Sequence, residues 1–316
     1  MSRGPFRTWK VAVLAGAIAA VVAVALAGCG LGAGKGTSGV TLTVTRNFGT
    51  GSVGSVSDSK VAGSQTVMRL LERSFKVTTR YGGGFVESIA GLSGGSSRRD
   101  WFYYVNGLEA PAGAAGTSVN QGDRIWWDLH NWTATDSIPA VVGSFPEPFA
   151  HGTGGRRLPT TLACGSDVGA ACKRVAAEFK TIGVPTPTVL IGTGSGSDSL
   201  AVVVGTWRDL HGELAATLIE HGPSASGVYA RFISPGGSSL QLLNPSGRVA
   251  RTLGAGAGLI AATGQSQTGT VWMITGTDVA GVSAAAAALT PARLRDHFAL
   301  AVQGATDLPV PLGAAG

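Results

Sequence analysis

The feature that most constrains the fold of this chain is a pair of aromatic-rich, strand-like segments between residues 101 and 132. Four of the seven tryptophans lie there, in WFYYVNG and in GDRIWWDLHNW. Alternate side chains of a strand point to opposite faces of its sheet. Trp101 and Tyr103 therefore share one face, and Phe102 and Tyr104 share the other. Each face carries aromatic rings, and one of the two faces must cover a hydrophobic core.

The face that does not cover the core has three possible uses. Its rings can pack inside the protein against a second domain, form a stacking surface for a planar ligand, or form a patch for a protein partner. For the ligand alternative, the candidate contacts are Arg99, Trp101, Tyr103, Asn106, Trp126 and Trp127. Arg99 belongs either to a solvated charged turn or to a site that binds a carboxylate or phosphate.

Residues 40–132 are predicted to form a sheet around one helix, a β-grasp-like arrangement. The segment VTLTVTRNF alternates apolar and polar residues, as a half-buried strand does. In SQTVMRLLERSF the apolar residues from Val67 to Phe75 fall on one helical face, and Ser64 is the expected N-cap. Several β-branched and aromatic segments follow, and Asn106-Gly107 is a typical hairpin turn.

These segments resemble a known family. The succession SQTVMRLLE, GGGFVESIAGL, WFYYVNG and NQGDRIWW is similar to the transcobalamin-type C-terminal domain of bacterial surface lipoproteins, over about residues 40–132. The most specific motifs are W-x-Y-x-V-N-G and G-D-x-I-W. The resemblance implies a cobalamin-like or other vitamin-like ligand and an importer in the membrane as a partner. No segment is recognisable as the large helical domain of the animal cobalamin carriers.

The N-terminus has the pattern of a lipoprotein signal peptide, residues 1–28. Three basic residues precede the 16-residue apolar run VAVLAGAIAAVVAVAL, which is shorter than a typical membrane span of about 20 residues. The run ends in Leu26-Ala27-Gly28-Cys29, which resembles the bacterial lipobox. Cys29 is the expected lipidation site, residues 29–39 a flexible tether, and the outer face of the bacterial cytoplasmic membrane the expected location. An uncleaved membrane anchor is the alternative.

The charge of the chain gives no reason to expect a nucleic-acid partner. The formal net charge is +6, and removal of residues 1–28 takes away three basic residues and no acidic ones, which leaves +3. No dense Lys/Arg stripe is present.

Two cysteines remain if Cys29 is lipidated. Cys164 and Cys172 form an even pair, which favours a disulfide in an oxidising compartment. Such a bridge stabilises a fold by about 2–3 kcal/mol on the loop-entropy model. A metal-binding pair is the alternative, but no nearby His or Cys completes a tetrahedral set.

The second half is predicted to be a mixed α/β domain over residues 158–305, after a Pro- and Gly-rich linker over residues 133–157 and before a tail over residues 306–316. The composition and periodicity of the second half predict four helices and five strands. The helices are expected at 167–183, 207–222, 279–289 and 291–302, and the strands at 199–206, 228–234, 239–244, 247–254 and 270–278. Buried apolar strands beside helices favour some parallel pairing.

Motifs for catalysis are missing from the sequence. The Gly-rich stretches 192–197 and 254–259 do not complete a phosphate-binding pattern and are expected to be turns. No nucleophile elbow is present, and Asp209, His211 and Glu213 alternate along a predicted helix, so that they do not share a face. We therefore expect a non-enzymatic, lipid-anchored protein that binds a small molecule. An interaction module without a small ligand is the second hypothesis, and a hydrolase is the third.

Overall fold

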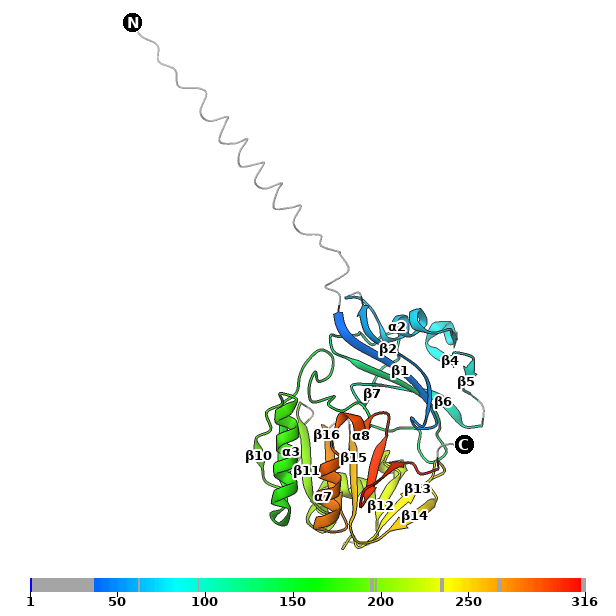
Figure 1. Ribbon diagram of the computed structural model, residues 1–316. Coiled ribbons are helices and arrows are strands. Elements are labelled where there is room, and N and C mark those ends of the chain that lie inside the picture. The colour runs from blue at the N-terminus through cyan, green and yellow to red at the C-terminus, as the bar shows by residue number, and fades with distance from the viewer. Residues whose placement is uncertain are drawn as a thin grey trace.

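The computed structural model describes Met1 and residues 37–313, except residues 62, 96, 194, 195, 197, 234, 235 and 266–268. Figure 1 shows two adjacent parts, which we call the first module (residues 37–132) and the second module (residues 158–313). Their helices and strands make an α+β fold, as predicted. The predicted signal peptide, Cys29 and most of the predicted tether lie outside the described residues.

The first module is a β-sheet that packs on one helix. Its main sheet has the order β2-β1-β8-β6-β7, in which β1 and β8 are parallel and the other neighbours antiparallel. These strands are β1 (Thr37–Arg46), β2 (Gly51–Val61), β6 (Arg99–Val105), β7 (Leu108–Glu109) and β8 (Arg124–Asn131). A small antiparallel sheet follows helix α2 (Val67–Ser74) in the chain and includes the 3-10 helix η1. Its elements are β3 (Val77–Arg80), η1 (Tyr81–Gly83), β4 (Phe85–Ile89) and β5 (Leu92–Ser93).

The helix of the first module is α2 (Val67–Ser74), which buries the apolar face expected from its sequence. Its N-cap is Thr66, whose hydroxyl accepts a hydrogen bond from the Arg69 backbone N–H at 3.3 Å. The prediction of Ser64 as the cap is therefore wrong. The chain stays extended to Thr66, which bridges to Ser118, so that the first helical turn starts two residues later.

The second module is built on a seven-stranded mixed sheet in the order β10-β9-β11-β16-β15-β17-β18. The first four strands of this order are parallel and the remaining neighbours are antiparallel. The strands are β9 (Thr160–Cys164), β10 (Thr188–Val189), β11 (Leu200–Thr206), β15 (Ala257–Gln265), β16 (Gly269–Gly276), β17 (Ala299–Gln303) and β18 (Thr306–Val310). The expected parallel pairing is present.

Different layers cover the two faces of this sheet. One face packs on α3 (Gly169–Thr181) and α7 (Val279–Ala288), which lie side by side in Figure 1. The other face packs on short helices, on a three-stranded antiparallel sheet and on the first module. The elements of this layer are α4 (Trp207–Leu210), α5 (Leu214–Glu220), α6 (Pro223–Ser226), β12 (Ala230–Phe232), β13 (Leu240–Leu243) and β14 (Val249–Leu253). The predicted hairpin strands of this region are confirmed.

Two predicted helices are wrong in extent. The segment 207–222 is divided into α4 and α5 by a turn that contains Gly212, a poor helix former. The segment 291–302 begins with the single turn α8 (Pro291–Leu294), reverses at Asp296 with a φ of 59°, and continues as β17. Its apolar run is buried on both faces of the sheet, and such a run does not distinguish a helix from a buried strand.

Two further segments belong to the sheet against expectation. The predicted tail begins with β18, whose Leu308 and Val310 side chains are buried and which pairs with β17. The predicted turn 254–259 leads at Ala257 into β15, a central strand. In β15 small residues hide the strand pattern, because Gly and Ala have low strand preference. In β18 the pattern is interrupted by Pro309, a residue that argues against a strand except at a sheet edge, where β18 lies.

The predicted linker 133–157 has no helix or strand, but it is part of the core. Phe145 and Phe149 are 1% and 0% exposed, and the Phe149 ring centroid lies 4.7 Å from that of Phe179 and 5.0 Å from that of Trp272. Pro and Gly prevent regular structure without preventing burial. Residues 133–157, which we call the connecting segment, therefore join the two modules and contribute to the core of the second.

Cys164 and Cys172 form the predicted disulfide, between the end of β9 and the first turn of α3. Among the described helices, none combines the length and the apolar character that a membrane crossing requires. The described residues also contain no group of three or more His, Cys, Asp or Glu side chains arranged to hold a metal ion.

Candidate functional site

One face of the aromatic strands covers helix α2. Trp101 is 6% exposed, and its indole N–H donates a hydrogen bond to the Leu92 carbonyl at 3.1 Å. The Tyr103 ring stacks on Trp127, with 4.8 Å between ring centroids. The Tyr103 hydroxyl also bonds to Thr117 Oγ1 at 2.9 Å. These three candidate residues therefore lie in or beside the core of the first module.

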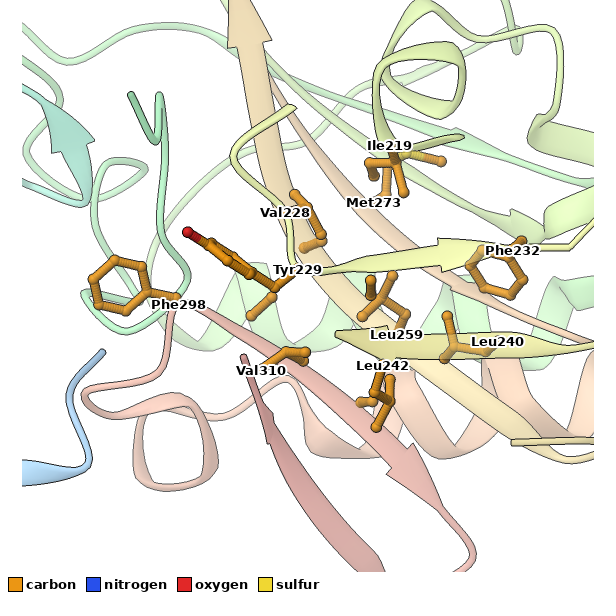
Figure 2. Close-up of a cluster of buried hydrophobic side chains, with 14 of the residues drawn as sticks. Ile219, Val228, Tyr229, Phe232, Leu240, Leu242, Leu259, Met273, Phe298 and Val310 are labelled. Carbon is orange, nitrogen blue, oxygen red and sulfur yellow. The ribbon is translucent and has the colours of Figure 1, made fainter. Parts of the chain in front are cut away.

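The opposite face packs against the second module. The Trp126 and Tyr104 rings have their centroids 5.0 and 5.6 Å from that of Phe298, which precedes β17. Phe48 adds contacts with Phe298 at 5.2 Å and with Tyr229 at 5.1 Å. Figure 2 shows Phe298 and Tyr229 at one end of the second module's hydrophobic cluster. The aromatic residues of both faces thus serve the core and the contact between modules, which is the first of the three alternatives raised by the sequence.

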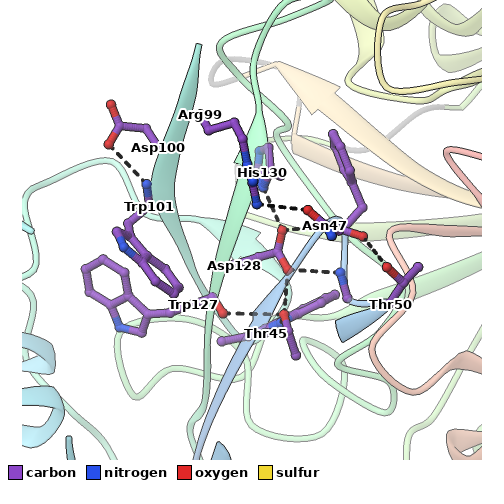
Figure 3. A network of polar contacts seen from close by, with 12 residues as sticks. Thr45, Asn47, Thr50, Arg99, Asp100, Trp101, Trp127, Asp128 and His130 are labelled. Atoms are coloured by element: carbon purple, nitrogen blue, oxygen red, sulfur yellow. Dashed lines mark hydrogen bonds and ion pairs between the residues drawn. The ribbon is translucent and has the colours of Figure 1, made fainter. Parts of the chain in front are cut away.

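A buried polar network supports this contact (Figure 3). The Asp128 carboxylate is fully buried and accepts hydrogen bonds from the Thr45 hydroxyl at 2.6 Å and from the Phe48 and Gly49 backbone N–H groups at 2.9 Å each. His130 Nδ1 lies 2.9 Å from the same carboxylate. The network therefore fixes the turn that presents Phe48 to the second module.

The Asp128–His130 pair has the composition of a carboxylate–imidazole dyad, but its surroundings are those of a structural pair. The Phe48 and Phe102 rings stack on the imidazole of His130, with centroid distances of 4.6 and 4.3 Å. His130 is 1% exposed. A general base needs to reach a substrate proton directly or through one water, and this burial leaves the imidazole no such access.

Arg99 and Asn106, the two polar candidates, are also bound to protein groups. The Arg99 guanidinium donates to Asn47 Oδ1 at 2.9 Å. Asn106 is fully buried; its amide donates to Asp123 Oδ1 at 2.9 Å and to the Gly152 carbonyl at 2.7 Å. The φ angle of 55° at Asn106 confirms the predicted turn. Asn106 thus connects the first module to the connecting segment.

An open cleft of about 1290 Å³ lies where the two modules and the connecting segment meet. It contains groups from β6, β7 and the following loop, from the connecting segment, and from the starts of β11 and β16. The lining residues are Val105, Leu108, Glu109, Ala110, Pro111, Thr117, Ser118, Asn120, Ser137, Pro139, Thr153, Gly154, Leu158, Ser199, Leu200, Ala225, Gly264, Gly269 and Thr270. None of the six ligand contacts expected from the sequence is among them.

Glu109 is the only ionisable side chain among the described residues that line the cleft. It lies on β7, and its Oε2 accepts a hydrogen bond from the Ser137 hydroxyl at 2.6 Å. Burial raises the pKa of Glu109. The other polar groups are neutral hydroxyls and amides, interspersed with aliphatic side chains. This mixture suits a ligand with an apolar body and a few hydrogen-bonding groups.

The contact between modules is expected to weaken in acid through His297, the neighbour of Phe298. Burial lowers the pKa of His297 from its ordinary value of about 6.5. Its contribution to stability is therefore complete above about pH 6.5 and is lost as the pH falls through its folded-state pKa.

When the pH falls from about 8 to about 5, we expect the free energy of unfolding to decrease more in wild type than in the His297→Asn variant. Denaturant unfolding at both pH values measures this, with His221→Asn, at an exposed position, as the control. A difference from wild type that does not change with pH contradicts the prediction.

Comparison with known families gives a match to the first module. The segment of residues 64–131, from just before α2 to the end of β8, matches a family described as a domain of unknown function (DUF4430). No curated protein is similar to the chain at the level required for a match.

Proposed function

We propose that this protein is a membrane-anchored, extracytoplasmic lipoprotein that binds a small molecule in the cleft between its modules. The observation that carries the proposal is the cleft itself, with a volume of about 1290 Å³ and with walls from both modules and the connecting segment. Ligand sites of about 300–1000 Å³ occur preferentially at such junctions. The larger volume here favours a ligand at or above drug size.

The class of ligand in this proposal is a cobalamin-like or other vitamin-like molecule, delivered to an importer in the membrane. The matched family is associated with transcobalamin-like domains. The sheet around one helix and the strand motifs that resemble the transcobalamin-type domain support the same class. The proposed position differs from the sequence hypothesis, because the aromatic rings are buried and the cleft begins at the end of β6. The lipid anchor at Cys29 rests on the lipobox-like sequence.

The proposal is tested by calorimetric titration of residues 30–316, which retain every described helix and strand. The vitamins are cyanocobalamin, thiamine, riboflavin and biotin. Ala225 lines the cleft and is exposed, so Ala225→Trp places a large side chain at the cleft without replacing a core residue. We expect at least one vitamin to bind to wild type and its binding to be lost in Ala225→Trp.

The matched control is Ser224→Trp, one residue away, exposed and outside the lining. Its affinity for the same vitamin should equal that of wild type. Equal affinities in the two tryptophan variants contradict the cleft as the site, and the absence of binding by all four vitamins contradicts the proposed ligand class.

A second candidate function is binding of a protein partner, and the edge strand β2 favours it. No described backbone group bonds to the outer edge of β2. The first half of the strand, residues 51–57, contains neither a charged side chain nor proline, two of the devices that usually prevent edge pairing. Asp58 and Lys60 confine the charges of β2 to its second half. A partner strand that pairs with β2 is therefore the alternative to a small ligand.

A further inference from the structure

The electrostatics of the cleft narrow the class of its ligand, on the condition that the cleft is the binding site proposed above. Among the described residues that line the cleft there is no Lys, Arg or His, and Glu109 is the single carboxylate. The cleft therefore presents one formal negative charge among neutral hydrogen-bonding groups. An anionic ligand would meet that charge without any cation in the lining to offset it.

The position of Glu109 is fixed by its backbone. The β7 strand pairs with β6, which places Glu109 opposite Tyr104. The Glu109 N–H donates to the Pro139 carbonyl at 3.1 Å, on the connecting segment. Leu108 also forms a bridge with Ala140. Glu109 thus lies on a short strand held from both sides, which limits the movement of its carboxylate.

The Glu109 carboxylate has hydrogen-bond donors but no cationic partner. Ser137 donates through its hydroxyl and Ile138 through its backbone N–H. No ion pair joins Glu109 to a basic residue anywhere in the described part of the chain. The ionisable groups that influence it are Asp136, Tyr104 and His130, and the basic one among them, His130, is bonded to Asp128.

A half-buried carboxylate of this kind loses hydration that two neutral donors only partly replace. A positively charged nitrogen close to the carboxylate compensates for this loss more fully, because the attraction between opposite charges is stronger where water is partly excluded. The aliphatic side chains of Leu108, Leu158 and Leu200 meanwhile offer contact for an apolar body.

We propose that the cleft selects ligands that combine a positively charged nitrogen with a largely apolar body, and that Glu109 pairs with the nitrogen. Among the four vitamins named above, thiamine is the cationic one, biotin is anionic, and riboflavin is neutral. Thiamine is therefore expected to bind more tightly than biotin and riboflavin.

The test is calorimetric titration of thiamine into wild type, Glu109→Gln and Glu72→Gln. Glu109→Gln keeps the size of the side chain and removes its charge. Glu72 is exposed on α2, away from the cleft, so Glu72→Gln removes the same charge without changing the lining. We expect thiamine affinity to fall about tenfold or more in Glu109→Gln, which corresponds to about 1.4 kcal/mol, and to stay unchanged in Glu72→Gln. The affinities of riboflavin and biotin should not fall in Glu109→Gln.

The failures of this inference and of the proposed function are distinguishable. If Ala225→Trp abolishes binding while Glu109→Gln binds thiamine as wild type does, the cleft is the site and the inference about charge is wrong. Tighter binding of biotin than of thiamine, or no thiamine binding to wild type, also overturns the inference. If Ala225→Trp binds thiamine normally, the site itself is wrongly assigned.

Discussion

Asp128→Ala is expected to lower the free energy of unfolding by about 3–5 kcal/mol, because it removes the acceptor shared by several buried hydrogen-bond donors. The carboxylate accepts hydrogen bonds from Thr45, Phe48 and Gly49 and contacts His130 in a position without solvent exposure. Alanine leaves these groups without an acceptor, and each unpaired buried donor costs about 1–3 kcal/mol. Urea denaturation followed by tryptophan fluorescence measures the change.

The control for this variant is Asp136→Ala, at an exposed position later in the same region. Its effect should stay within about 0.5 kcal/mol, as for most surface substitutions. Because the Asp128 network fixes the turn that carries Phe48 against the second module, Asp128→Ala should also weaken ligand binding in the cleft. A loss of less than about 1 kcal/mol would show that the network adds little to stability.

Gly49→Ala is expected to have the second-largest effect, a loss of about 2–5 kcal/mol, through close contact between the modules. Gly49 has a φ of 82°, which L-residues with a side chain rarely adopt, and an added Cβ would lie 1.8 Å from the Asp296 carbonyl oxygen. The same Cβ would lie 3.1 Å from Trp126 Cζ2. Because the close atom belongs to the backbone of the second module, the overlap can be relieved only by a shift of backbone at the contact between the modules.

Gly91→Ala separates the two components of this loss. Gly91 has the same φ of 82°, but an added Cβ would have no atom within 4 Å. It therefore measures the backbone strain alone, and the difference between the two variants measures the overlap between modules. Chemical denaturation of both variants under one condition gives that difference. Equal losses in Gly49→Ala and Gly91→Ala would mean that the modules do not pack as described.

Much of the first module could be predicted from its sequence because its signals are local. The apolar face of α2 and the Asn106-Gly107 turn depend on neighbouring residues, and both are confirmed. Strand alternation also separated Trp101 and Tyr103 from Phe102 and Tyr104. The partner of each face was not predictable, because Phe298 and Tyr229, which cover the second face, lie more than a hundred residues later in the chain.

The second module was less predictable because its segments are rich in small apolar residues. The run from Phe298 to Val302 fits either a helix or a buried strand, and only its neighbours β15 and β18 decide between them. The cleft was beyond local patterns altogether. Glu109, Ser137 and Thr270 come from three separate parts of the chain, and none of them belongs to a motif. Only the packing of the modules brings them together.

The central claim, that a ligand occupies the cleft between the modules, is tested most directly by hydrogen–deuterium exchange. Residues 30–316 are compared with and without thiamine at a saturating concentration, and exchange is followed peptide by peptide. The account predicts slower exchange in residues 105–120 of the first module and in residues 269–272 of the second, both of which contribute to the cleft. Protection confined to one module, or to segments outside the cleft such as α2 and β2, would contradict it.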